Sequence, residues 1–134
     1  MVSSVLCLAF AIYFEAGNQD LKGKLAVGQV VLNRVESGRY PNNTCDVVKQ
    51  NRQFSFYSDG KPERLPIEAD KQEYKVWNES YQIASFLLSE GSSGDHVVDS
   101  TNGAMHYHAY YVSPKWVNDQ KVKIGDHLFY SQID

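Results

Sequence analysis

The stretch Ile12-Tyr13-Phe14-Glu15-Ala16-Gly17 closes an apolar run that begins at Val5, and the rest of the chain is arranged around it. The run is apolar on nearly every side, which is typical of a short helix buried in the core of a small domain. The sequence therefore predicts a central helix that ends at Gly17 or Asn18 and carries a carboxylate in its last turn.

Glu15 is that carboxylate, and it lies on the inward face of the predicted helix. Side chains three, four and seven positions apart stack over one another, so Glu15 shares its face with Leu8, Ala11 and Ile12. Burial and the nearby carboxyl end of the helix both disfavour the charged form, and both would raise the pKa of Glu15. A general acid needs such a carboxyl, which keeps its proton near neutral pH. The alternative is a Glu15 that reaches solvent from a frayed helix end.

The size and charge of the chain indicate how many domains it has and which kinds of partner it can bind. With 134 residues, 15.2 kDa and 43% hydrophobic residues, it can form one well-packed core, and we expect a single domain over residues 1–134. A net charge of -3 and scattered Lys and Arg residues argue against nucleic acid as a partner. Nine Tyr, six Phe and two Trp supply flat amphipathic surfaces, which suit either a core or a carbohydrate cleft.

The N-terminal residues show whether the sequence contains a recognisable signal peptide. They lack a basic segment and a cleavage site, so we expect the apolar run to be part of the fold and not a signal peptide. No stretch approaches the roughly 20 apolar residues of a membrane span, and membrane insertion is not expected. Export would then need another route, or a signal that has already been removed.

Cys7 and Cys45 are the two cysteines of the chain. In a reducing compartment they would be buried thiols, whereas in an oxidising one they could form a disulfide between the first helix and the third segment. The sequence leaves both possibilities open.

Hydrophobic spacing predicts the remaining elements. Helices are expected over 21–36 and over 45–50 with Thr44 as the N-cap. A long amphipathic helix is expected to begin at the capping-box-like pair Asp70 and Glu73 and to end near Gly91. Strand-like runs cover 53–57 and 104–112, and 123–130 resembles a turn with a short terminal strand. Asn33, late in the second helix, either hydrogen-bonds a neighbouring segment or faces solvent.

Two of these segments carry polar side chains that could join Glu15 in one site. Alternation along the strands places Gln53 and Ser55 on one polar face, and His106, His108 and Tyr110 on another. One protonated carboxyl with polar side chains that orient sugars fits an enzyme that cleaves glycosidic bonds.

Two other functions remain open. His106 and His108 could bind one metal together with His96 or His127, as in a zinc hydrolase that attacks an amide. No third ligand has a motif spacing, so hydrogen bonding is the favoured role of these histidines and no metal is expected. A non-catalytic sugar-binding module would use the aromatic residues, but it would leave Glu15 without a task.

Six blocks of the sequence resemble the cell-wall hydrolase family that includes the spore cortex-lytic enzymes. They follow the family order and cover nearly the whole chain. The blocks lie within 12–16 (IYFEA), 23–35 (GKLAVGQVVLNRV), 40–48 (YPNNTCDVV), 53–61 (QFSFYSDGK), 106–116 (HYHAYYVSPKW) and 124–130 (IGDHLFY).

The resemblance implies a peptidoglycan-cleaving enzyme with a small, mainly helical, lysozyme-like α+β fold and a short antiparallel sheet. The catalytic acid of the family's Tyr-x-Glu-Ala motif falls on Glu15. Tyr13 opens that motif and is a weaker candidate for substrate contact, with packing in the core as its alternative role. The implied reaction is that of a lytic transglycosylase at the bond between N-acetylmuramic acid and N-acetylglucosamine, without a cofactor. An N-acetylmuramoyl-L-alanine amidase with a His-bound metal is the alternative.

The sequence departs from the family pattern directly after Glu15. The family continues Ala-Arg-Gly-Glu, whereas this chain reads Ala16-Gly17-Asn18-Gln19. An arginine is therefore missing, and Gln19 replaces a second carboxylate.

The expected partner is the glycan strand of peptidoglycan, bound by a monomer in the periplasm or at the extracellular face. The compact format suits a phage endolysin released through a membrane lesion, and it suits equally a catalytic domain from an exported bacterial protein.

Overall fold

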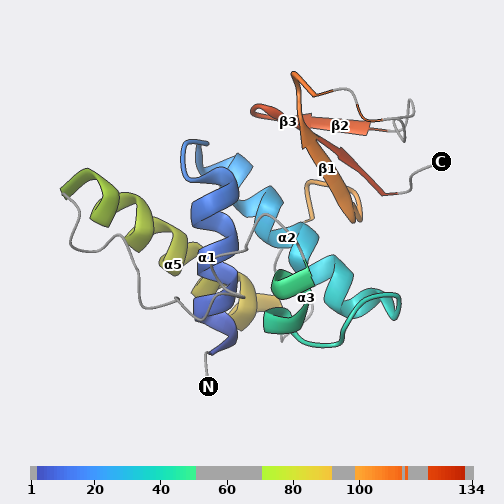
Figure 1. Ribbon diagram of the computed structural model, residues 1–134, viewed down its shortest axis with the longest axis horizontal. Coiled ribbons are helices and arrows are strands. Elements are labelled where there is room, and N and C mark those ends of the chain that lie inside the picture. Colours follow the sequence, from blue (N-terminus) through green and yellow to red (C-terminus); the bar gives the residue numbers. More distant parts are fainter. Residues whose placement is uncertain (1–2, 51–70, 92–98, 113, 115–120, 132–134) are drawn as a thin grey trace.

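The structure is a computed structural model that describes residues 3–50, 71–91, 99–112, 114 and 121–131. Four helices and three short strands are defined in this part of the chain (Figure 1). The expected α+β fold, mainly helical with a small antiparallel sheet, is confirmed. The strand predicted over 53–57 lies outside the described residues. The elements are α1 (Ser4–Ala16), α2 (Leu21–Ser37), α3 (Thr44–Gln50), α5 (Lys71–Gly91), β1 (His106–Ala109), β2 (Lys121–Ile124) and β3 (His127–Tyr130).

Helix α1 is the centre of the helical layer, and α2, α3 and α5 pack around it (Figure 1). Its residues 7–12 are all buried, which confirms the prediction of a helix surrounded by core on nearly every side. The Phe10 ring lies 5.3 Å from the Trp77 ring of α5. Side chains of α1 and α5 lie close to Gly28 of α2, where a Cβ atom would lie 2.6 Å from Leu87 Cδ1 and 3.1 Å from Ile12 Cδ1. A side chain at position 28 would therefore separate the helices.

The helix ends follow from local capping. The Asp20 side chain accepts from the Gly23 backbone N–H at 3.0 Å and starts α2, and Gly38, with φ 81°, ends it. The prediction that Thr44 caps α3 is wrong: Asn43 Oδ1 accepts from the Asp46 N–H at 2.9 Å, and Thr44 is buried in the first turn. The asparagine one residue earlier has an equally suitable side chain, and sequence alone did not distinguish the two.

The three strands form an antiparallel sheet in the order β1-β3-β2. The strand predicted over 104–112 is shorter than expected. Residues 123–130, predicted as a turn and one strand, instead belong to a hairpin whose turn contains Gly125, with φ 59°, and Asp126. The hairpin makes β3 the central strand, so its residues pair with both neighbours.

The sheet is attached to the helices by a second, smaller core and by polar contacts from α2. Asn33 Nδ2 donates to the Ala104 carbonyl at 2.8 Å, and Arg34 Nε donates to the Met105 carbonyl at 2.7 Å. Asn33 thus binds a neighbouring segment, the first of its two predicted roles. The second core consists of Ala16, Ala26, Val27, Val30, Ala104 and Phe129.

Cys7 and Cys45 are joined by a disulfide, with their Cα atoms 5.2 Å apart. The bond joins α3 to the first half of α1, whereas Glu15 lies in the last turn of the same helix. Of the two states left open by the sequence, the structure has the oxidised one.

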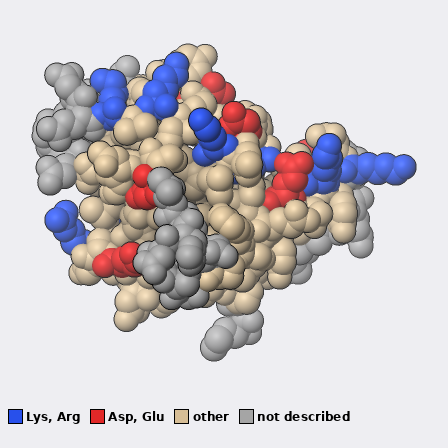
Figure 2. Space-filling view, turned by 180° about the vertical axis from the view of Figure 1, so that it is seen from behind, with Lys and Arg blue, Asp and Glu red and all other residues tan. Residues whose placement is uncertain are grey.

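The surface charges are mixed. Figure 2 shows Lys and Arg side chains spread over one face and interspersed with Asp and Glu. Among the helices that the structure describes, none is both long and apolar enough to cross a membrane.

Candidate active site

Glu15 lies in the last turn of α1 and is half-buried, at the point where the helix meets the sheet. The Tyr107 hydroxyl of β1 donates a hydrogen bond to Glu15 Oε1. The Tyr107 ring is fixed by two aromatic neighbours, with its centroid 5.5 Å from that of Phe129 and 5.3 Å from that of His127. A rigid phenol thus holds one oxygen of the Glu15 carboxyl.

The electrostatics of the pair keep the phenol protonated. Burial raises the pKa of Tyr107 well above its ordinary value, and the adjacent Glu15 carboxylate raises it further through its charge and its hydrogen bond; Arg34 opposes these effects weakly. The Tyr107 hydroxyl therefore remains a hydrogen-bond donor at physiological pH. Its donation is strongest when Glu15 is ionised.

A cleft of about 430 Å³ opens at this pair. Its walls come from the end of α1, the α1–α2 connection, strand β1 with the residues that follow it, and the β2–β3 turn. Polar groups dominate the lining, as expected for a surface that binds sugars and not a lipid or an apolar ligand. The polar side chains that line it are Glu15, Asn18, Gln19, Tyr107, His108, Tyr111, Asp126 and His127.

Two histidines lie in the wall of the cleft. His108 Nε2 is 2.9 Å from the Tyr130 hydroxyl, and its Nδ1 is 2.7 Å from the Ala109 carbonyl. Among the described residues, none is a hydrogen-bond partner of Nδ1 of buried His127. Burial lowers the pKa of His127, His108 adds to this, and Asp126 opposes it. His127 is therefore predominantly neutral near pH 7.

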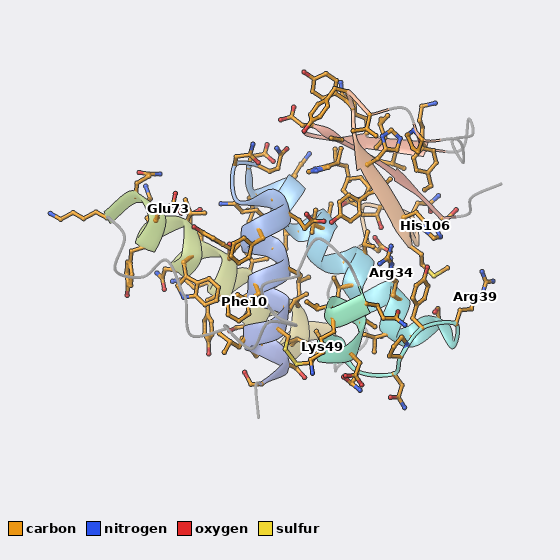
Figure 3. The ribbon with its side chains drawn as sticks, in the orientation of Figure 1. Phe10, Arg34, Arg39, Lys49, Glu73 and His106 are labelled. Carbon is orange, nitrogen blue, oxygen red and sulfur yellow. A yellow bond between two sulfur atoms is a disulfide. The ribbon has the colours of Figure 1, made fainter. Side chains whose placement is uncertain are left out.

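The predicted site residues divide into those inside the cleft and those outside it. Glu15 and His108 are in the lining, whereas His106 and Tyr110 are not. His106 lies toward Arg34 (Figure 3), and burial, followed by the charge of Arg34, lowers its pKa. Tyr110 is 59% exposed, with Lys123 Nζ 5.8 Å from its ring centroid. Gln53 and Ser55 lie outside the described residues.

Tyr13 points away from the cleft, toward α5. Its hydroxyl donates to Glu73 Oε2, and its ring contacts Phe14 and Trp77. These contacts indicate that Tyr13 packs between α1 and α5. We therefore leave Tyr13 out of the substrate-binding set.

Tyr107 is the site residue that the sequence reasoning missed. Alternation along this strand puts Tyr107 on the face opposite His106 and His108, and the histidine face was taken as the one that lines the cleft. In the structure the Tyr107 face covers the second core and meets the end of α1. The inward stripe that ends at Glu15 was the available signal, since a buried carboxylate needs a buried donor across from it.

The metal hypothesis placed His106 and His108 with His127 or His96. His106 and His108 point to different surroundings, and the part of the chain that the structure describes contains no cluster of three or more His, Cys, Asp or Glu side chains suited to a metal. His96 is outside the described residues.

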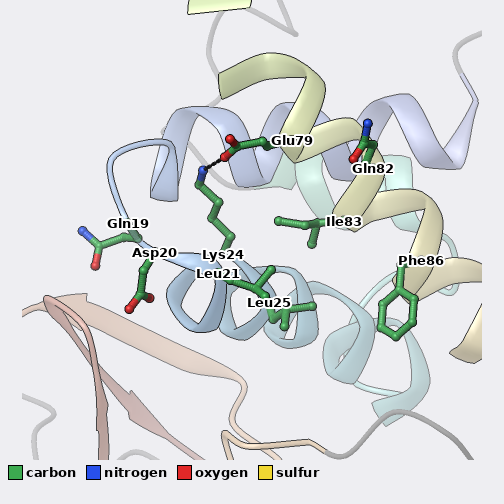
Figure 4. A pocket seen from close by; sticks show the side chains of 9 residues that line it. All are labelled: Gln19, Asp20, Leu21, Lys24, Leu25, Glu79, Gln82, Ile83 and Phe86. Carbon is green, nitrogen blue, oxygen red and sulfur yellow. Dashed lines mark hydrogen bonds and ion pairs between the residues drawn. The ribbon is translucent and has the colours of Figure 1, made fainter. Parts of the chain in front are cut away.

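A second cavity, of about 580 Å³, lies between α2 and α5 (Figure 4). Its walls are mainly apolar and include Leu21, Leu25 and Ile83. Its charged side chains are Asp20, which accepts from the Gly23 N–H at 3.0 Å as the cap of α2, and the ion pair of Lys24 and Glu79, with Nζ 2.8 Å from Oε2. Lys24 lowers the pKa of Glu79 by hydrogen bond and charge. A carboxylate held in its charged form is a poor general acid, so the Glu15 cleft is the better candidate for catalysis.

Comparisons with known proteins agree with this assignment of the fold. The spore cortex-lytic enzyme of Bacillus cereus is 29% identical over 134 residues, covering 95% of this chain and 44% of the relative. That of Bacillus subtilis is 27% identical over 136 residues, covering 95% of this chain and 37% of the relative. The chain thus spans less than half the length of the curated relatives it matches.

Solved structures show the same architecture. The catalytic domain of the germination-specific lytic transglycosylase SleB from Bacillus anthracis superposes with a TM-score of 0.62 at 26% identity, covering 94% of this chain and 92% of that one. The catalytic domain of the Bacillus cereus SleB protein gives a TM-score of 0.59 at 24% identity, covering 94% of this chain and 88% of that one. The sequence pattern of the Cell Wall Hydrolase family matches residues 18–130. The chain belongs to the Cell Wall Hydrolase family.

Proposed function

We propose that this protein cleaves the glycan strands of peptidoglycan between N-acetylmuramic acid and N-acetylglucosamine, as a lytic transglycosylase with Glu15 as its single acid and base. The observation that supports this most directly is the position of Glu15, half-buried in a polar cleft and hydrogen-bonded by Tyr107. The relatives named as spore cortex-lytic enzymes and the likeness to a lytic transglycosylase support the substrate class.

The reaction needs two proton transfers at one carboxyl. Protonated Glu15 donates its proton to the glycosidic oxygen as the bond from that oxygen to C1 of the muramic acid breaks. The 6-hydroxyl of the same muramic acid then attacks C1 and gives its proton to the Glu15 carboxylate. A 1,6-anhydro ring forms, and Glu15 is again protonated. Tyr107 assists because its donated hydrogen bond strengthens as negative charge develops on Glu15.

The carboxylates of the cleft favour this mechanism over hydrolysis with two catalytic carboxyls. Among the described residues that line the cleft, Asp126 is the one carboxylate besides Glu15. Its Oδ2 accepts from Gln19 Nε2, and its backbone is part of the β2–β3 turn. A carboxylate engaged in holding a turn is poorly placed to activate water or to attack a sugar.

Substrate contacts are assigned to the remaining polar groups. We assign Tyr107, His108 and His127 to the cleft wall, and we retain Gln53, Ser55, His106 and Tyr110 as weaker candidates from the sequence. The disulfide is consistent with work outside the reducing cytoplasm, at the cell wall. We expect a monomer, to be checked by light scattering.

The test is digestion of purified peptidoglycan by the wild type and Glu15→Gln, with and without EDTA, with products identified by mass spectrometry. Anhydromuramyl products that persist in EDTA and vanish in Glu15→Gln are expected. Glu36→Gln, the same chemical change on the exposed side of α2, is the matched control and should retain activity.

Other products would refute the proposal in distinguishable ways. Reducing muramic acid ends would mean hydrolysis by a water that another group activates. Free stem peptides that disappear on chelation would indicate the amidase alternative. Binding without cleavage, unchanged in Glu15→Gln, would indicate a non-catalytic wall-binding module.

A further inference from the structure

The side chain of Gln19 joins the helical layer to the tip of the sheet. Its Nε2 donates to Asp126 Oδ2 at 3.0 Å, and its Oε1 accepts from the Asp126 backbone N–H at 3.0 Å. Both polar atoms of one amide are therefore used on one residue of the β2–β3 turn. In Figure 1 this turn points toward the connection between α1 and α2.

Backbone hydrogen bonds extend this contact to both halves of the proposed catalytic pair. The Gln19 N–H donates to the Ala16 carbonyl at 2.9 Å, one residue after Glu15. The Asp126 carbonyl accepts from the Tyr110 N–H at 2.8 Å, just beyond the strand that carries Tyr107. A continuous hydrogen-bonded path thus runs from the end of α1, through the Gln19 amide, to the end of β1.

The Gln19 side chain lies close to the backbone of two glycines, Gly23 and Gly125. A Cβ atom at Gly23 would lie 2.7 Å from Gln19 Cβ, and one at Gly125 would collide with Gln19 Oε1. Gly125 also has φ 59°, which disfavours any other residue there. The side chain therefore fits between the first turn of α2 and the hairpin tip, on the boundary between the cleft and the second cavity (Figure 4).

We infer that Gln19 is a positioning residue: its amide clamps the β2–β3 turn to the α1–α2 connection and so keeps Tyr107 against Glu15. The inference rests on the proposed role of Glu15. An amide satisfies both groups of Asp126, which presents an acceptor, its carboxylate, and a donor, its N–H. A carboxylate at position 19 would face Asp126 Oδ2 with a second negative charge, and the repulsion would move the two side chains apart and weaken the bond to the N–H as well.

Exchanging the two side-chain types gives a sharp test. Gln19→Glu breaks the clamp, whereas the double variant Gln19→Glu, Asp126→Asn restores the side-chain hydrogen bond with donor and acceptor exchanged, and the backbone N–H of residue 126 donates to the position 19 side chain as before. Asp126→Asn alone keeps an acceptor for Gln19 and should stay near the wild type. We expect kcat on peptidoglycan to fall by about tenfold or more in Gln19→Glu, the loss that corresponds to one hydrogen bond to a charged group, and to recover in the double variant.

Two readouts do not depend on activity. Hydrogen exchange of the residue 126 amide reports the bond to the position 19 side chain directly. The 13Cζ NMR shift of Tyr107 reports its hydrogen bond to Glu15. Both should change in Gln19→Glu and return in the double variant. Removal of the disulfide by Cys7→Ala with Cys45→Ala is the control for lost stability, because it destabilises the fold away from the clamp and should leave both readouts unchanged below the melting temperature.

Each outcome decides the inference. An unchanged amide exchange and Tyr107 shift in Gln19→Glu would overturn it, and so would faster exchange at residue 126 with an unaltered Tyr107 shift. Loss of kcat that the double variant does not restore would also overturn it. If the clamp responds as expected but Glu15→Gln still cleaves peptidoglycan, then the proposed function fails while the clamp between Gln19 and Tyr107 stands.

Discussion

Replacement of Tyr107 by Phe removes one oxygen atom and so tests the hydrogen bond between Tyr107 and Glu15. Phenylalanine keeps the ring contacts with Phe129 and His127, and it removes the hydroxyl that donates to Glu15 Oε1. A hydrogen bond to a charged group contributes about 1.5–3 kcal/mol. At about 1.4 kcal/mol for each factor of ten in rate, kcat should fall by roughly 10- to 150-fold.

The pH profile should change as well. Loss of a donor disfavours the carboxylate form of Glu15, so the alkaline limb of kcat should move to higher pH while its maximum falls. Release of anhydromuramyl fragments from purified peptidoglycan, measured between pH 4.5 and 9, gives both quantities. Tyr81→Phe on α5, the same change on a half-exposed ring, should leave the profile as in the wild type. A kcat within twofold of the wild type at every pH would refute the role given to Tyr107.

Three further outcomes concern the stability of the fold. Gly28→Val should lower the free energy of unfolding by about 1–3 kcal/mol, because the added atoms overlap Leu87 and Ile12, and urea titration would measure it. Removal of the disulfide, which closes a separation of 38 residues, should cost about 4 kcal/mol in the same assay, and a loss below 1 kcal/mol would contradict the simple loop-closure account. The folded-state pKa values of His106 and His127 lie below the unfolded value of 6.5. Stability should therefore be constant above about pH 6.5 and decrease as pH falls further, because the unfolded chain binds protons that the native state does not; thermal melts of His106→Gln and His127→Gln should show a weaker decrease.

The helices were predictable from the sequence because each carries several turns of apolar spacing. Leu21 and the residues that follow it gave the second helix nearly to its last residue. The sheet was harder, since its strands have only four residues and such short runs contain little periodicity. The turn at Gly125 and Asp126 was recognised, but the strand before it, with alternating Lys and apolar residues, was not.

Within the site, Glu15 was predictable and its partners were not. The inward stripe on the first helix predicted the half-buried position of Glu15, the proposed acid, because one face of one helix is a local property of the sequence. Tyr107 and Gln19 act through contacts that span 92 and 107 residues. No local pattern encodes such contacts, so Gln19 was visible only as a departure from the family motif and had no role until Asp126 was found beside it.

The hydrogen bond from Tyr107 also gives the two oxygens of Glu15 different tasks. In the proposed mechanism the phenol donates to Oε1, which disfavours a proton on that atom, so the transferable proton would lie on Oε2. The scissile oxygen must then approach from that side of the carboxyl group. A glycan strand is chemically directional, with a reducing and a non-reducing end, so only one of its two orientations in the cleft brings the 6-hydroxyl back to the same oxygen. The Tyr107 hydroxyl would thereby determine in which of its two directions a glycan strand binds productively in the cleft.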